Sequence, residues 1–122
     1  MRKRSLLLTE QELEIMKIIW TRGEATVRDV YEELRQHRPI AYTTVLTMLG
    51  VLEGKEHVGK VPSDERAFLY RPMRPKEELI GSILSDFVAR VFNGSGKEVV
   101  HYLLQTGEIS REELIELSRL PN

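Results

Sequence analysis

The apolar residues near the beginning of the chain recur at helical spacing in three short segments. Thr9 and Glu12 form a Thr-x-x-Glu capping box at the start of the first segment, and Gly23 is placed to end it. Thr26 opens the second segment with a similar pattern, and the spacing predicts a helix that continues to about His37. These two segments therefore predict two amphipathic helices.

The third segment, from Tyr42 to Lys55, predicts the helix around which the rest of the chain is organised. Val45, Leu49 and Leu52 recur at i, i+4 and i+7, which gives this helix a stripe that faces the core. Small hydroxyl side chains lie mostly off that stripe, near the start of the helix, at Thr43, Thr44 and Thr47. Such side chains suit an exposed surface that approaches phosphates and base edges, although one of the first two threonines is expected to cap the helix instead.

Two short apolar runs joined by a polar turn follow the third helix. Residues 58–61 and 67–70 predict two strands, and residues 62–66 predict a turn that carries a basic residue. A helix followed at once by such a hairpin is the outline of a winged helix-turn-helix. We therefore expect a mainly α fold with a small β-hairpin, in which residues 1–72 form a winged-helix DNA-binding domain.

Two prolines within residues 71–75 predict a domain boundary, because proline bars both a helix interior and a central strand. Residues 76–92 predict a fourth helix with roughly two apolar residues per turn, and two shorter amphipathic helices follow it. So much apolar surface on three helices favours a two-fold dimer of residues 73–122, although packing back on the N-terminal half as one monomeric core is the alternative. The predicted dimerisation residues are Leu79, Ile83, Phe87, Val91, Val99, Leu103, Leu114 and Leu117.

The composition excludes several classes of protein. The chain has no cysteine, and its three histidines are far apart in the sequence, so we expect neither a disulfide framework nor a metal site, and no cofactor. No apolar run is long enough to cross a bilayer, and the basic start of the chain lacks a signal-peptide cleavage site, so we expect a cytoplasmic protein without a membrane partner. Nucleotide-binding loops and catalytic constellations are also missing, which argues against an enzyme.

The charge distribution weakly favours nucleic-acid binding by the N-terminal half. The formal net charge is −1, with 13 Lys/Arg against 11 Asp/Glu through Arg74 and 5 against 8 after it. The sign fits a DNA-reading half, but the excess is small. A winged-helix adaptor that binds protein instead of specific DNA is therefore the alternative function.

Three motifs in register resemble those of the penicillinase/methicillin-resistance repressor family, to which the copper-responsive repressors are related. They are Leu8-Thr9-x-x-Glu12-Leu13-Glu14-Ile15-Met16-x-Ile18-x-Trp20, Ala41-Tyr42-Thr43-Thr44-Val45-x-Thr47-x-Leu49, and Arg66-Ala67-Phe68-x-Tyr70-Arg71-Pro72. The resemblance implies a homodimeric transcriptional repressor that binds an inverted-repeat operator through a recognition helix and a wing. The DNA-binding residues expected on this basis are Tyr42, Thr43, Thr44, Thr47, Lys55, Lys60 and Arg66, with Tyr42 reaching a phosphate or a thymine methyl group.

The chain also departs from the family pattern in three places. Members are commonly released from DNA when a sensor pathway triggers their cleavage, but residues 97–106 lack the Asn-Phe bond that is cut, so the inducer is a sensor-linked protease or another signal. Without cysteine the chain cannot use the metal hook of the copper-responsive branch. The segment from Gly50 to Glu56 keeps only Lys55 of the usual basic residues, so either the affinity is modest or Lys60, Arg66 and the basic arm at residues 2–4 compensate.

Overall fold

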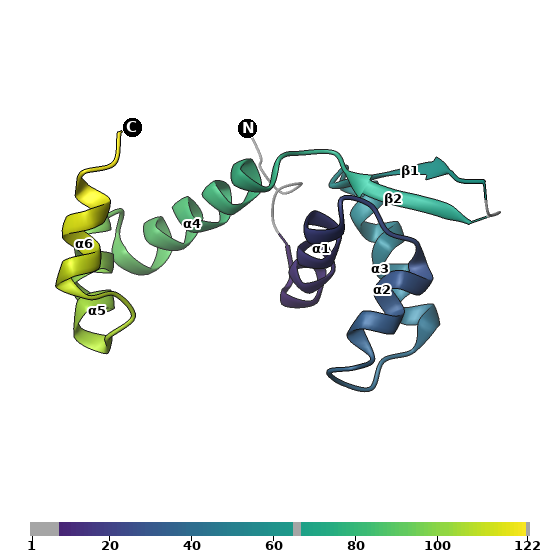
Figure 1. Cartoon of the computed structure of the whole chain (residues 1–122), viewed down its shortest axis with the longest axis horizontal. Helices are drawn as coiled ribbons and strands as arrows, with labels where there is room; N and C mark the ends of the chain where they lie inside the picture. The colour runs from purple at the N-terminus through teal and green to yellow at the C-terminus, as the bar shows by residue number, and fades with distance from the viewer. Residues whose placement is uncertain (1–7, 65–66, 122) are drawn as a thin grey trace. The chain divides into compact units, whose positions relative to one another are not determined.

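The computed structural model describes residues 8–64 and 67–121, which divide into two compact units. The first unit is Met1–Ser82 and the second is Ile83–Asn122. The first unit holds three helices, α1 (Glu10–Arg22), α2 (Val27–Leu34) and α3 (Tyr42–Gly54), and a hairpin of two strands, β1 (Val58–Pro62) and β2 (Phe68–Pro72) (Figure 1). This arrangement confirms the predicted mainly α fold with a winged-helix character.

Local capping sets where the first two helices begin. The Thr9 hydroxyl accepts a hydrogen bond from the Glu12 N–H at 3.1 Å, and the Glu12 carboxylate accepts one from the Thr9 N–H at 2.9 Å. Thr26 and its partner three residues later form the same reciprocal pair before α2. The second helix ends at Leu34 instead of about His37. Beyond Leu34 the N–H groups of Gln36 and His37 donate to the carbonyls three residues before them, as in a 3₁₀ turn.

The hairpin pairs its strands antiparallel, with Val58 opposite Pro72 and Pro62 opposite Phe68. Each strand extends further toward the C-terminus than predicted. Both prolines fit at strand ends of a two-stranded sheet, since every strand in it is an edge. An isolated bridge between Ala25 and Tyr70, with N–H···O distances of 3.0 and 2.8 Å, ties the hairpin to the loop before α2.

The core of the first unit lies where the three helices meet the hairpin. Its fully buried members include Ile15, Ile19, Val30, Val45, Leu49 and Leu52. The predicted apolar stripe of α3 is therefore buried. The opposite face of α3 consequently points away from the core.

The second unit begins inside α4 (Lys76–Phe92) and continues through α5 (Gly96–Thr106) and α6 (Arg111–Ser118). The boundary between the two compact units falls after Ser82, and the first turn of α4 contains the buried Leu79. No residue between 83 and 121 is buried in the single chain. No helix among the described residues is long and apolar enough to cross a membrane.

Candidate nucleic-acid interface

The outer face of α3 is exposed and carries no formal charge. It consists of Thr43, Leu46, Thr47, Gly50, Val51 and Gly54, all of which are exposed. Glu53 is the only charged residue between the first and last residues of this helix. This face can therefore contact a partner only through hydroxyl groups, apolar groups and the backbone.

The threonines near the start of α3 do not cap it, which corrects one expectation. The N-cap is Ala41, and no side-chain hydrogen bond caps the helix. Because the helix begins at Tyr42, Thr43 and Thr44 already lie within its first turn, beyond the position from which a hydroxyl caps. Thr43, Thr44 and Thr47 are all exposed, so their side chains face solvent as predicted.

A groove runs beside α3, between the start of α2 and the hairpin. Tyr42 and Leu46 of α3, Arg28 of α2, Lys60 of β1 and Phe68 of β2 are among its lining residues. The Arg28 guanidinium carbon lies 5.8 Å from the centre of the Tyr42 ring, and Lys60 Nζ lies 4.7 Å from the centre of the Phe68 ring. Aromatic faces attract cations at these distances, so the groove holds two positive groups, each beside an aromatic ring.

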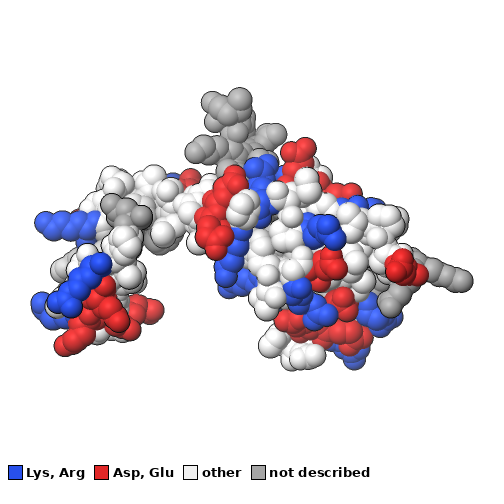
Figure 2. All heavy atoms as spheres, turned by 45° about the horizontal axis from the view of Figure 1, so that its top comes forward, with Lys and Arg blue, Asp and Glu red and all other residues white. Residues whose placement is uncertain are grey.

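The two groove cations also have carboxylate neighbours at the surface. Arg28 lies 3.2 Å from a Glu32 oxygen, and Lys60 Nζ lies 4.0 Å from a Glu53 oxygen. Acidic and basic residues alternate in this way over the face of the molecule drawn in Figure 2. Exposed ion pairs of this kind contribute little free energy, about 0–1 kcal/mol, so a phosphate can replace either carboxylate at low cost.

Lys55 is placed differently from the other predicted DNA-binding residues. Its Nζ lies 2.9 Å from Glu12 Oε1, and the Glu12 side chain is only 8% exposed. Burial raises the pKa of Glu12, but the hydrogen bond from the Thr9 N–H and the Lys55 ammonium together outweigh it and leave the pKa below its ordinary value. A phosphate contact by Lys55 would compete with this ion pair between α3 and α1.

The buried His57 lies close to this ion pair, just before β1. Its side chain is enclosed, and neither ring nitrogen has a hydrogen-bond partner among the described residues. Burial lowers the pKa of His57, and the positive charges of Arg74 and Lys55 lower it further. His57 is therefore a neutral core residue, not a DNA-contacting group.

Some predicted DNA-binding residues lie outside the described part of the chain, and some residues of the groove were not predicted. Arg66 and the basic arm at residues 2–4 lie outside the described residues. Arg28, Leu46 and Phe68, in contrast, line the groove although sequence reasoning did not select them. The sequence does hold one indication of the role of Leu46, because an apolar residue off the buried stripe of α3 is expected to be exposed. Nothing in the sequence indicates that Arg28 lies beside the hairpin.

A second exposed surface lies on the helices of the second unit. Among the predicted dimerisation residues, Phe87, Val91 and Leu117 are 42%, 52% and 52% exposed. Ile83, Val99, Leu103 and Leu114 are half-buried, while Leu79 is already buried within the chain.

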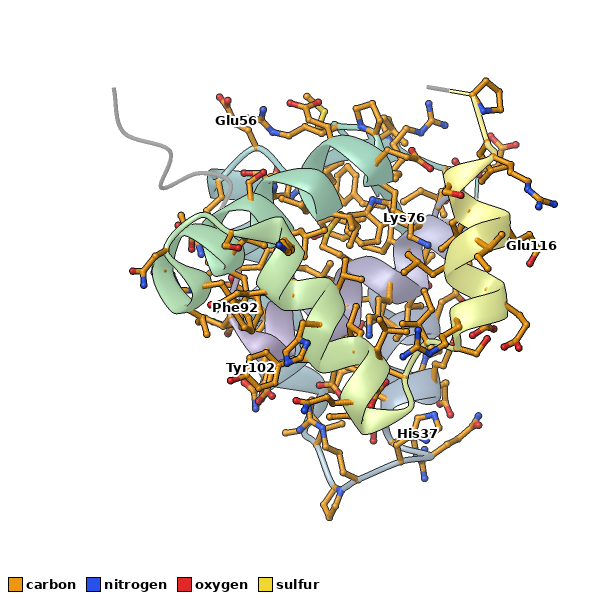
Figure 3. The ribbon with its side chains drawn as sticks, turned by 90° about the vertical axis from the view of Figure 1, so that its left-hand side faces the viewer. His37, Glu56, Lys76, Phe92, Tyr102 and Glu116 are labelled. Carbon is orange, nitrogen blue, oxygen red and sulfur yellow. The ribbon has the colours of Figure 1, made fainter. Side chains whose placement is uncertain are left out.

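An aromatic cluster joins two helices of this unit. The Phe92 ring lies 5.8 Å from that of Phe87 and 5.7 Å from that of Tyr102, and Figure 3 shows Phe92 and Tyr102 side by side. Phe87 and Tyr102 remain 42% and 51% exposed, so the cluster holds α4 against α5 and still presents apolar surface to solvent.

Three helices, a hairpin beside them and an uncharged exposed face on the third helix define a protein of the winged-helix class. Comparison with known proteins is consistent with this class. The family model described as penicillinase repressor matches residues 8–121. The transcriptional regulator BlaI of Mycobacterium tuberculosis (strain CDC 1551 / Oshkosh) is 34% identical over 103 residues, which cover 82% of this chain and 74% of that protein.

Two further relatives match over longer stretches. The penicillinase repressor of Bacillus licheniformis is 28% identical over 113 residues, covering 93% of this chain and 88% of that protein. The methicillin resistance regulatory protein MecI of Staphylococcus aureus (strain N315) is 22% identical over 115 residues, covering 94% and 93%. The chain belongs to the penicillinase repressor family, a family of transcriptional repressors, which confirms the resemblance carried by the three sequence motifs.

Proposed function

We propose that this protein is a homodimeric repressor that binds an inverted-repeat DNA operator and blocks transcription. Each protomer inserts α3 into the major groove and lays the hairpin along the adjacent backbone. The observation that carries the proposal is the exposed outer face of α3, flanked by the groove cations Arg28 and Lys60. The family's repressors lend it further support.

The division of labour follows from the same observations. Residues 1–72 bind DNA, through Tyr42, Thr43, Thr44, Thr47 and Lys60, and through Arg66, which lies outside the described residues. Arg28 joins this set because it lines the same groove. Residues 73–122 bring two protomers together.

The dimer proposal is supported by what the second unit lacks. None of its described residues is buried in the single chain, although it carries several large apolar side chains. Monomeric proteins rarely expose contiguous apolar surface on this scale. A second copy related by two-fold symmetry would cover the same face on both chains and would match an inverted-repeat operator. Ile83, Phe87, Val91 and Leu117 are the proposed centre of this interface; Leu79 is left out because it is already buried.

The signal that relieves repression is open, because residues 97–106 lack the Asn-Phe bond at which family members are cut. We propose a cytoplasmic protein whose repression is relieved by a sensor-linked protease or by another inducing signal. Induction would act by weakening either the dimer or the fit of α3 to DNA.

Two substitutions test where DNA binds. Thr47→Ala removes a hydroxyl and a methyl group from the outer face of α3 and should change which duplex is preferred. Lys60→Ala removes one phosphate contact per protomer, so it should weaken binding to all duplexes alike and reduce the salt dependence of binding by about one ion per protomer, or about two for the dimer. Arg90→Ala is the matched control, because this arginine pairs with Asp86 on α4, within the second unit.

The outcome separates the repressor from the adaptor. Fluorescence anisotropy on the promoter region of the protein's own gene, against a scrambled duplex, measures both effects. If both variants bound both duplexes as the wild type does, the placement of the interface would be wrong. If the wild type itself bound every duplex equally and weakly, the adaptor function would be favoured.

A further inference from the structure

We propose that α3 selects its operator mainly by apolar contact with thymine methyl groups and that Leu46 is the principal reader. The inference rests on the proposed function, because it concerns how the same helix recognises DNA. It goes further in assigning a base chemistry and a residue to the recognition.

The first argument is the set of side chains that α3 lacks. Bases are usually distinguished in the major groove by arginine or lysine on guanine, by asparagine or glutamine on adenine, and by carboxylates on cytosine. From Tyr42 to Gly54, all of which the structure describes, there is no arginine, lysine, asparagine or glutamine, and Glu53 is the only carboxylate. The usual hydrogen-bonded readout of purines is therefore absent from this helix.

The second argument is what α3 presents instead. Leu46 is 47% exposed and Val51 is 42% exposed, on a helix whose other aliphatic side chains, Val45, Leu49 and Leu52, are fully buried. The exposed Thr43, Thr44 and Thr47 add methyl groups as well as hydroxyls. Thymine is the base that offers a methyl group in the major groove, and apolar side chains and the threonine methyl recognise it by contact.

The third argument is that Leu46 lies in the same groove as the two groove cations. Leu46 lines the same groove as Arg28 and Lys60, which come from α2 and β1. A DNA strand whose phosphates meet these two cations is fixed in register beside α3. Leu46 then lies on the side of the helix next to the positioned strand, where a base edge is within reach.

The test begins with a duplex that the protein binds specifically, selected from a random library. Each thymine of one half-site is then replaced by deoxyuridine, which pairs identically but lacks the methyl group. One buried methylene-sized group corresponds to about fourfold in affinity, so we expect about a fourfold loss at one or two positions per half-site. Replacing one such thymine in both half-sites should give about a sixteenfold loss.

Variants of Leu46 assign the effect to this side chain. Leu46→Ala removes the contact from both protomers, so it should bind the thymine duplex about sixteenfold more weakly and should no longer distinguish it from the deoxyuridine duplex. Leu46→Gln should move the preferred base at that position from thymine toward adenine, because glutamine pairs with the adenine edge. Leu120→Ala, at an exposed leucine of the second unit, is the control and should leave the deoxyuridine effect unchanged.

Each result has a distinct meaning. Specific binding that is insensitive to deoxyuridine would overturn the methyl readout and leave the repressor function intact. Deoxyuridine sensitivity that persists in full in Leu46→Ala would overturn the assignment to Leu46. Failure to select any specific duplex would instead count against the proposed function itself. Circular dichroism of each variant shows that a change in binding is not a loss of folding.

Discussion

Gly50, in the middle of α3, allows stability and DNA binding to be separated. Its backbone is helical, and a Cβ at this position would meet no other atom within 4 Å. Alanine restricts the unfolded chain more than glycine does, so Gly50→Ala should stabilise the first unit by about 0.5–1 kcal/mol. For a domain of this size the melting temperature should rise by about 2–8 °C.

The same substitution should weaken operator binding. The new methyl group would stand on the outer face of α3, the face that we propose enters the major groove. We expect a loss of affinity on the order of tenfold, which corresponds to about 1.4 kcal/mol. Thermal melts followed by circular dichroism and anisotropy on the operator measure the two effects in the same preparation.

Gly81→Ala is the matched control for this experiment. Gly81 is also an exposed glycine inside a helix, α4, with no atom within 4 Å of an added Cβ. It should raise stability by a similar amount and leave the affinity for DNA unchanged. If Gly50→Ala bound the operator as tightly as the wild type, the middle of α3 would not face DNA. If it gave no increase in melting temperature, the helix argument itself would fail.

Three further predictions concern stability and assembly. Lys55→Met leaves the buried Glu12 carboxylate without its ammonium partner, so urea denaturation should show a free energy of unfolding lower by about 1–2 kcal/mol. The pKa of Glu12 is lowered in the folded protein, so this difference from the wild type should shrink below about pH 4.5, as the carboxylate becomes protonated. Because the pKa of His57 is lowered, the unfolded state binds more protons than the folded state below about pH 6.5, so the free energy of unfolding should fall as the pH drops through this value. His57→Leu should flatten this pH dependence. The control variant His37→Asn, at an exposed histidine, should leave it in place. Phe87→Asp places a charge in the apolar surface of α4 and should give monomers, and an unchanged mass by light scattering would contradict the dimer model.

The helices were predictable because their signals are local. The capping pairs at Thr9 and Thr26 act over three residues, and the apolar stripe of α3 is a property of one helix, so sequence alone located these elements. The exact ends were less predictable. The end of α2 depends on which residue first leaves helical geometry. The N-cap of α3 was ambiguous because several hydroxyl-bearing residues near its start could have capped it.

The contacts between distant segments were not predictable in the same way. Lys55 forms an ion pair with Glu12, which lies 43 positions away in the sequence, and no local sequence pattern at either residue predicts this contact. The groove beside α3 joins α2, α3 and both strands, so the place of Arg28 in it depends on how the hairpin packs beside α2. Residues that depend on the packing of separate elements needed the structure.

The central claim is that two protomers read one operator, and the mass of the complex on DNA tests it most directly. Duplexes carrying the full inverted repeat, one half-site or a scrambled sequence would be compared by analytical ultracentrifugation at several salt concentrations. We predict two protomers on the full repeat, with a preference of about 10³ or more over the scrambled duplex at physiological salt. One protomer per duplex, bound equally to all three sequences, would contradict the claim.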